Sequence, residues 1–174
     1  MTRTKGTLTE EEAIELFEME KFPTDDMTLY INENFTIDLE SEDREEKFFI
    51  SYHRASITLK YTDQLRCRTH IPLLRLDIGG AMHTNPRISS PCLPRDPFYD
   101  VHDHCIGRVF LPGEPHIHFY REGYDDRWAY PVPKEFTDLN DVLRTMKQFL
   151  AKCNVVRPPS IQRGFFDGDG ERSF

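Results

Sequence analysis

The sequence predicts an α+β domain: a mostly antiparallel sheet of five to seven strands, with an N-terminal helix and a C-terminal helix packed on the sheet. Three observations support this fold class. The chain has 174 residues, of which 38% are hydrophobic and 30% charged, which suits one domain with a core. Apolar residues recur with the helical period near each end of the chain. Between these ends they alternate with polar residues, and clusters of turn-forming residues separate the alternating segments.

The first element is a helix over about residues 9–21. Thr9-Glu-Glu-Glu12 has the form of a capping box, with a hydroxyl at the N-cap and a carboxylate three residues later. An apolar stripe of Ala13, Ile14, Leu16 and Phe17 follows at helical spacing. Pro23 then ends the helix, because proline has no backbone N–H to continue it.

Strands follow the helix. Phe35, Ile37 and Leu39 alternate with polar residues, as in a half-buried strand. Two further strands are predicted at 47–53 and 56–62, which are rich in Phe, Ile, Tyr and Thr. The three segments form an antiparallel meander.

A fourth strand is predicted through 66–78. Pro72 interrupts its hydrogen-bonding pattern, which favours a sheet edge or a bulge. Gly79-Gly80 ends this segment.

The second half of the chain begins with a loop over 81–113, which holds five of the twelve prolines and shows little periodicity. A hairpin follows, with strands at 115–120 and 127–130. The closing helix starts near Thr137 or Asp138 and is expected to end near Asn154. We therefore expect a single domain over residues 1–156 and a mobile tail over 157–174.

Charge and composition exclude several classes of protein. Residues 1–46 carry 15 acids and 4 bases, so this front part is strongly acidic and is not suited to general polyanion binding. No apolar run reaches the roughly 18 residues of a membrane span, and the N-terminus lacks a signal peptide. The four cysteines form no Cys-x-x-Cys pair. We expect a cytoplasmic protein with no membrane contact.

Histidines carry the main functional signal. Five of the seven fall within 36 residues, where they are His83, His102, His104, His116 and His118. In a strand, alternate side chains share a face, so we expect His116, His118 and Tyr120 to project together as catalytic residues. A histidine pair on one face can divide the roles of general base and general acid, or can bind a metal through neutral nitrogens.

A divalent transition metal is the cofactor that this cluster suggests, although the sequence leaves the cofactor unidentified. His83, His116 and His118 are the first candidate ligands. A second candidate set comprises His102, His104 and Cys105. The structural alternative stays open, because histidines and tyrosines are ordinary residues of half-buried strand faces.

Candidate substrate-binding residues lie on both sides of this cluster. His83 and Asn85 belong to a turn before Pro86 that can bring an imidazole and an amide to the sheet. Arg121 and Tyr124 lie at the hairpin turn, where they are expected to hold phosphate.

Four motifs resemble an uncharacterised family of small proteins from bacteria and their phages or mobile elements. These motifs are Leu73-Leu-Arg-Leu-Asp77, His83-Thr-Asn-Pro86, Pro115-His-Ile-His-Phe-Tyr-Arg-Glu-Gly-Tyr-Asp-Asp-Arg-Trp-Ala-Tyr-Pro131 and Phe149-Leu-Ala-Lys-Cys-Asn154. The resemblance covers about residues 8–156 and implies a microbial or phage source, but it supplies no catalytic assignment. The stretch from about Ile88 to Gly113 is longer than in the family, so His102, His104 and Cys105 belong to an insertion.

The leading hypothesis from the sequence is a small phosphodiester-cleaving enzyme, a ribonuclease or a hydrolase of small or cyclic nucleotides, with nucleotide or RNA as substrate. The alternative is a non-enzymatic phage protein that inhibits a host defence protein, in the manner of an anti-CRISPR, through the acidic segment 10–46. A structural or antitoxin-like partner without any site is a third hypothesis.

Overall fold

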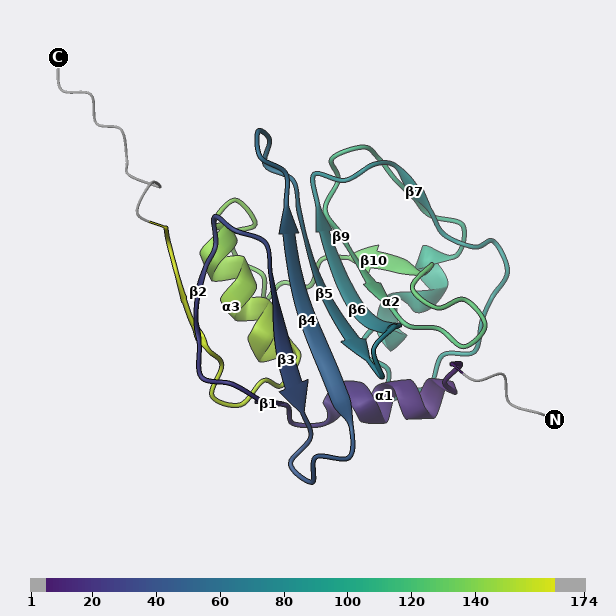
Figure 1. The fold of residues 1–174 in the computed structure, drawn as a ribbon. Helices are drawn as coiled ribbons and strands as arrows, with labels where there is room; N and C mark the ends of the chain where they lie inside the picture. Colours follow the sequence, from purple (N-terminus) through teal and green to yellow (C-terminus); the bar gives the residue numbers. More distant parts are fainter. Residues whose placement is uncertain (1–5, 165–174) are drawn as a thin grey trace, which may run out of the picture.

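The structure is a computed structural model that describes residues 6–164 (Figure 1). A seven-stranded antiparallel sheet has the order β1-β3-β4-β5-β6-β9-β10. Its strands are β1 (Phe22–Pro23), β3 (Phe35–Glu40), β4 (Lys47–Arg54), β5 (Tyr61–Cys67), β6 (Ile71–Ile78), β9 (His116–Phe119) and β10 (Ala129–Pro131). The helices are α1 (Glu10–Glu18), α2 (Tyr99–His102) and α3 (Val142–Lys152), and η1 (Asp103–Cys105) is a 3-10 turn. The expected α+β fold class is confirmed.

Helix α1 begins with the expected capping box. The Thr9 hydroxyl accepts a hydrogen bond from the Glu12 amide, and the Glu12 carboxylate accepts one from the Thr9 amide. The helix ends at Glu18, earlier than residue 21, because Met19 is extended and the buried Lys21 ammonium donates to the carbonyls of Phe17 and Met19.

Helix α3 starts later than the sequence predicted. Asp141 is its N-cap, and the Asp141 carboxylate accepts a hydrogen bond of 3.0 Å from the Arg144 amide. Thr137 and Asp138 precede the helix in a turn region. Asn154 follows the helix with a φ of 56°, which agrees with its expected place at the C-terminal end.

Two strand boundaries differ from the predictions. The predicted strand 56–62 is wrong, because residues 55–60 form the turn before β5 and the strand begins at Tyr61. The predicted strand 66–78 is two strands, since Arg68 and Thr69 adopt positive φ angles of 50° and 78° and reverse the chain. The turn between the two strands consists of polar residues, so the hydrophobic pattern of the sequence does not show where the chain reverses.

Pro72 lies at a β-bulge, as the sequence allowed. Leu65 pairs with Leu74 while Arg66 pairs with Pro72, so Leu73 has no partner on β5. Proline has no backbone N–H to donate. A proline is tolerated in this central strand because the bulge interrupts the regular hydrogen-bonding pattern there.

The core lies between the sheet and the two longer helices. Phe17 of α1 packs edge-on against Phe119 of β9, with ring centroids 5.2 Å apart. Tyr61 of β5 donates a hydrogen bond of 2.7 Å to the Leu139 carbonyl just before α3. The face of the sheet that packs against α1 and α3 is called the inner face. The outer face carries polar side chains on β5 and β6, which are half-buried.

The loop 81–113 contains more regular structure than expected. It holds α2, η1 and the paired strands β7 (His83–Thr84) and β8 (Val109–Phe110). The loop contacts both faces of the sheet near β9 and β10. On the inner face, Phe98 stacks on Tyr130 with ring centroids 4.5 Å apart. His83 lies against the histidines of the outer face.

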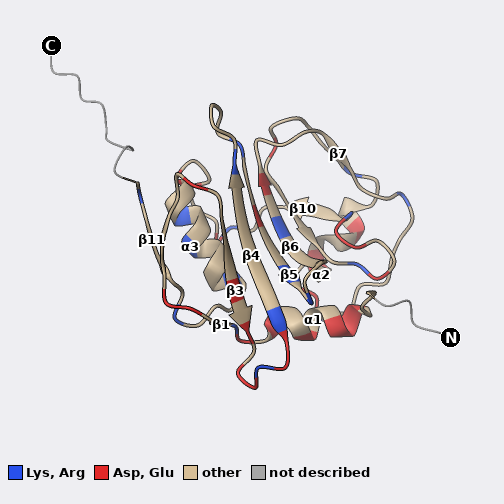
Figure 2. Ribbon diagram, in the orientation of Figure 1, with Lys and Arg blue, Asp and Glu red and all other residues tan. Residues whose placement is uncertain are grey.

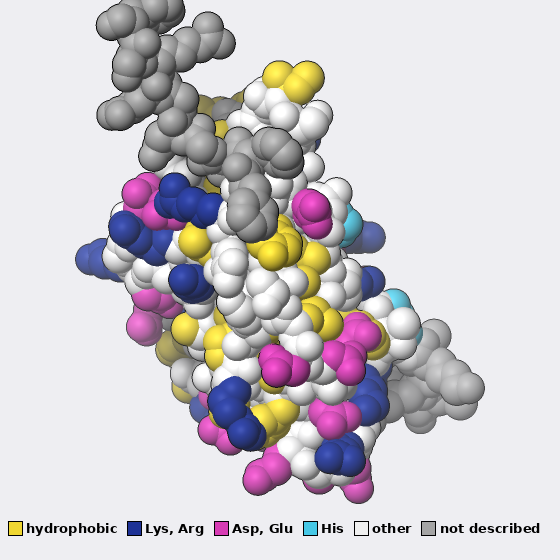
Figure 3. All heavy atoms as spheres, turned by 60° about the vertical axis from the view of Figure 1, so that its left-hand side comes forward, with side chains coloured by type: hydrophobic (Ala, Val, Ile, Leu, Met, Phe, Trp, Pro, Cys, Tyr) yellow, Lys and Arg dark blue, Asp and Glu magenta, His cyan; other side chains and the backbone are white. Residues whose placement is uncertain are grey.

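The C-terminal part also differs from the predicted mobile tail over 157–174. Strand β11 (Ser160–Gln162) pairs in parallel with β2 (Thr28–Tyr30). Figure 3 shows the side of the molecule that carries these strands and α3, where basic, acidic and apolar side chains are interspersed. Residues 165–174 of the predicted tail lie outside the described residues. Among residues 6–164, no helix is long and apolar enough to cross a membrane.

Candidate metal centre

Two pairs of facing residues build a polar cluster on the outer face of the sheet. In the register of β6 and β9, Arg75 pairs with His118 and Asp77 pairs with His116. Leu74 and Leu76 alternate with the polar residues of β6 and point into the core. All four polar side chains therefore lie on one face, opposite the core.

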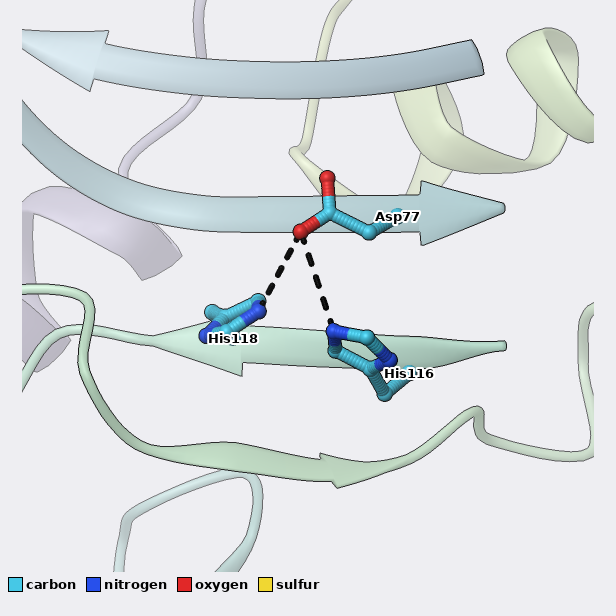
Figure 4. Close-up of side chains that lie close together, drawn as sticks. All are labelled: Asp77, His116 and His118. Atoms are coloured by element: carbon cyan, nitrogen blue, oxygen red, sulfur yellow. Dashed lines mark ion pairs between the residues drawn. The ribbon is translucent and has the colours of Figure 1, made fainter. Parts of the chain in front are cut away.

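The carboxylate of Asp77 is the meeting point of both imidazoles (Figure 4). Asp77 Oδ2 lies 3.2 Å from His118 Nε2 and 3.8 Å from His116 Nε2. One ligand atom from each of the three residues lies within 4.8 Å of the other two. Within residues 6–164, this is the one group of histidine, cysteine and acidic side chains with the spacing of a metal site.

Second contacts fix two of these side chains. His116 Nδ1 lies 2.8 Å from the Glu114 carbonyl, so this nitrogen is the donor, and in the neutral ring Nε2 carries the lone pair. Asp77 Oδ1 accepts a hydrogen bond of 2.8 Å from the Thr62 hydroxyl, which leaves Oδ2 for the imidazoles. Histidine ligands of metals usually have such a second partner on their remote nitrogen.

A third imidazole, that of His83, covers the pair. Its ring stacks on His116 at 5.7 Å and meets His118 edge-on at 4.7 Å. His83 Nε2 lies 3.0 Å from Asn85 Oδ1 and 2.9 Å from the Arg127 carbonyl. Both partners are acceptors, so Nε2 carries the proton and Nδ1 the lone pair.

Arg75 joins the cluster from the side of β6. Its Nε donates to Asp77 Oδ2 at 2.9 Å, and its Nη2 lies 3.0 Å from His118 Nε2. Its Nη1 forms an ion pair with Asp126 in the turn between β9 and β10. The guanidinium therefore uses the same oxygen and the same nitrogen that a metal would use.

The surroundings favour the ionised form of the Asp77 carboxylate and the neutral form of two imidazoles, those of His118 and His83. Burial alone raises the pKa of Asp77, but the hydrogen bond from His118 and the charge of Arg75 outweigh burial and hold that pKa well below its usual range. Burial lowers the pKa of His118 and of His83. An ionised carboxylate beside neutral imidazoles is the protonation state that binds a metal.

Exposure shows from which side the cluster can be reached. The side chains of His116 and His118 are 3% and 0% exposed, whereas those of Asp77 and Arg75 are 17% and 27% exposed. An approaching molecule therefore meets Arg75 and the carboxylate first.

Three of the residues expected to act on substrate lie elsewhere. The expectation that Tyr120 shares the histidine face is wrong, because its buried hydroxyl accepts from the amide of Leu8 and donates to the Leu8 carbonyl. Arg121 is fully buried and bonded to Asp96, so it is not available to phosphate. Tyr124 packs edge-on against the buried Trp128 at 6.3 Å.

The remaining candidates have structural contacts. Asn85 is buried, and its side chain hydrogen-bonds to the backbone of Ala129 and Cys105. His102 has both ring nitrogens engaged, one by the Tyr130 hydroxyl and one by the Ser90 carbonyl. His102, His104 and Cys105 do not form a metal-type group among the described residues.

Sequence reasoning missed Arg75 and Asp77 as members of the site. A signal was present, since both alternate with apolar residues in Leu74-Arg-Leu-Asp-Ile78 and so share a polar face. The pairing of β6 with β9, which brings them to the histidines, is a long-range contact that this alternation does not specify.

Comparison with known proteins agrees with the resemblance to a family of unknown function. The sequence matches the model of a family of unknown function, DUF6978, over residues 8–155. No curated protein and no solved structure matches the chain. Because the match spans most of the sequence and coincides with the extent expected from the motifs, the chain belongs to this family of unknown function.

Proposed function

We propose that the protein is a phosphodiester-cleaving enzyme that holds a divalent transition metal between Asp77, His116 and His118. The convergence of the three ligand atoms on the outer face carries this proposal. Ligand atoms about 2.0–2.1 Å from a tetrahedral zinc are about 3.3 Å apart. Asp77 Oδ2 lies 3.2 and 3.8 Å from the two imidazole nitrogens, and all three atoms lie within 4.8 Å of one another, so a modest closure of the ligands would hold the metal.

The chemistry of the ligands narrows the choice of metal. Two imidazoles and one carboxylate suit Zn²⁺, Mn²⁺, Fe²⁺ or Ni²⁺, whereas Mg²⁺ and Ca²⁺ prefer oxygen ligands alone. A metal with three protein ligands keeps an open position, where a bound water becomes acidic enough to act as a nucleophile. His83 lies against both histidines with an unprotonated Nδ1, so it could orient substrate or take up a proton if a metal is held there.

A phosphodiester substrate is supported by charge. Arg75 is a cation at the accessible side of the cluster, where it can stabilise the additional negative charge of a phosphoryl transition state. Residues 47–174 carry 18 bases and 15 acids, while the excess acid of the chain is confined to residues 1–46. Nucleotides or short RNA therefore suit this part of the protein better than the acidic front part.

Metal analysis and a cleavage assay test the proposal together. Full-length protein is loaded with Zn²⁺, Mn²⁺, Co²⁺ or Ni²⁺, dialysed, and analysed by elemental mass spectrometry. We expect about one equivalent of metal in the wild type, and none in the variant His116→Ala/His118→Ala. His53→Ala is the matched control, because His53 is exposed on the outer face of β4 and is not one of the three proposed ligands.

Cleavage of a chromogenic phosphodiester, a short RNA and cyclic nucleotides is then measured with and without a chelator. The proposal requires activity that depends on the metal and on both histidines. Activity that survives the chelator but not the double variant would instead support metal-free acid–base catalysis by His116 and His118. If the protein neither binds metal nor cleaves any of these substrates, the proposed enzymatic function is refuted.

A binding function is the second candidate, favoured by the distribution of acids. Glu11, Glu15 and Glu18 lie exposed on one side of α1, and the turn after β3 is also acidic (Figure 2). A hollow of about 440 Å³ lined by Met19, Glu20, Ser41, Glu42 and Asp43 connects the two elements. This surface is suited to a basic partner such as a nucleic-acid-binding defence protein.

Charge reversal separates the two functions. In an inhibitor, Glu11→Lys/Glu15→Lys abolishes function and the double histidine variant does not, whereas an enzyme shows the opposite pattern. We place either function in the cytoplasm, since all four cysteines are free thiols, as is usual in a reducing compartment.

A further inference from the structure

Arg75 makes two contacts with the atoms that would hold the metal. Its Nε is 2.9 Å from Asp77 Oδ2 and its Nη2 is 3.0 Å from His118 Nε2. Asp77 Oδ2 is also the oxygen nearest to both imidazoles. A metal ion bound to these two atoms would take the place that the guanidinium occupies beside them, so the side chain must move when metal binds.

A second carboxylate is available to hold the displaced side chain. Arg75 Nη1 is already paired with Asp126, whose side chain is 25% exposed and lies in the turn between β9 and β10. Rotation of the guanidinium away from Asp77 therefore need not break this ion pair. Because the Arg75 side chain is itself 27% exposed, the movement does not require a change in the core.

We propose that Arg75 is an internal cation that occupies the metal position in the metal-free protein and exchanges with the incoming metal. Held by Asp126, the displaced guanidinium then stands beside the metal and binds the phosphate of the substrate through its fork of donors. This inference rests on the proposed metal centre and assigns Arg75 as its substrate-binding residue.

The exchange also explains how the cluster is stable without metal. Asp77 and His118 are 17% and 0% exposed, and an ionised carboxylate with so little contact to water needs a positive partner. Arg75 supplies that partner until a metal replaces it.

The first test measures Co²⁺ affinity by competition with a chelating dye, for the full-length wild type and two arginine variants. In Arg75→Ala the competing cation is gone, so we expect Co²⁺ to bind about tenfold more tightly, the equivalent of one charge-assisted hydrogen bond. Arg66→Ala is the matched control, since Arg66 is a half-buried arginine on β5 that stacks on Phe49 and has no contact with the three ligand residues.

The outcomes separate this inference from the proposed function. If the wild type and Arg75→Ala bind Co²⁺ equally, or if Arg66→Ala gains as much, the exchange is refuted while the metal centre stands. If neither the wild type nor Arg75→Ala binds any metal, the metal centre itself is refuted.

The second test uses Asp126, and it does not depend on the folding of Arg75→Ala. Without this carboxylate the guanidinium stays on Asp77, so Asp126→Asn should bind Co²⁺ several-fold more weakly. Asp125→Asn removes the same charge from the same exposed turn and should bind like the wild type. Equal weakening in both variants would indicate a general effect of charge and would contradict the exchange.

The third test measures inorganic phosphate binding to the Zn²⁺-loaded proteins by calorimetry. We expect Arg75→Ala to lose about tenfold in phosphate affinity, and Arg75→Lys to recover only part of it because an ammonium lacks the planar fork. Unchanged phosphate affinity in Arg75→Ala would show that the arginine only occupies the metal position and does not bind substrate.

Discussion

The side-chain amide of Asn85 pairs with both backbone groups of Ala129, as another strand would. Asn85 Oδ1 accepts from the Ala129 amide at 2.8 Å, and Asn85 Nδ2 donates to the Ala129 carbonyl at 2.7 Å. Ala129 belongs to β10, the last strand of the sheet. The same oxygen, Asn85 Oδ1, also lies 3.0 Å from His83 Nε2. One amide thus pairs with the edge strand of the sheet and orients the imidazole of His83, which covers the candidate metal centre.

We predict that Asn85→Ala destabilises the protein by about 2–4 kcal/mol, because it leaves the buried groups of Ala129 and the Cys105 carbonyl without partners. Urea denaturation followed by circular dichroism measures the loss. Asn140→Ala is the control, since Asn140 is exposed. A loss no larger than in the control would show that water replaces the amide.

The hydroxyl of Tyr120 binds the backbone just before α1 and does not belong to the candidate metal centre. Tyr120→Phe removes two hydrogen bonds to the Leu8 backbone, of 2.9 and 3.0 Å. We expect a loss of about 1–3 kcal/mol in the free energy of unfolding. Phosphodiester cleavage at a temperature where the variant is folded should stay at the wild-type rate. A large fall in kcat without loss of stability would restore the catalytic role expected from the sequence.

Arg121 is the centre of a buried ion-pair network. It donates hydrogen bonds of 2.8 Å to the Tyr130 hydroxyl and of 3.0 Å to Glu10 Oε2 and to Asp96 Oδ1, and a further one to Asp96 Oδ2. Its side chain is 0% exposed. Arg121→Met leaves buried carboxylates without a cation and should cost about 3–5 kcal/mol.

A second substitution tests the cause of this loss. In Arg121→Met/Asp96→Asn one of the unpaired charges is also removed, so part of the stability should return. Thermal melts of the two variants measure the difference. Simple addition of two destabilising effects would show that Asp96 is not the group stranded by the loss of Arg121.

Asp63 gives the stability a pH dependence. It is fully buried in β5, and neither carboxylate oxygen has a hydrogen-bond partner among residues 6–164. Burial, and next the negative charge of Asp77, raise the pKa of Asp63 well above its ordinary value. The folded state therefore keeps this proton to a higher pH than the unfolded chain. The contribution of Asp63 to stability is complete at low pH and is lost as the pH rises toward the folded pKa.

Asp63→Asn has no titrating group at this position. The Tm of the variant minus that of the wild type should therefore increase by a few degrees between pH 4 and pH 7.5, since about 1 kcal/mol of stability corresponds to about 2–4 °C in Tm. Asp38→Asn on the exposed face of β3 is the control. A difference in Tm that stays constant with pH would mean that Asp63 is not protonated in the folded state.

The order of elements was accessible to sequence reasoning wherever a periodic pattern was long. The capping box at Thr9, the alternation in β3 and the hairpin of β9 and β10 each gave the right type of element. Errors occurred at turns, as between β5 and β6, and at short elements. Strand β11 has three residues, and its pairing with β2 is a contact across most of the chain. Local patterns do not carry that information.

The prediction of the site also succeeded for local patterns and failed for long-range contacts. By itself the sequence determined that His116 and His118 share a strand face, because the period of a strand is two residues. It did not determine which side chains meet them. The pairing of β6 with β9 brings Asp77 and Arg75 to the imidazoles, and the bonds of Tyr120 and Arg121 draw these two residues away. Only tertiary packing decides such contacts, since they join residues whose separation in sequence leaves many alternative pairings open.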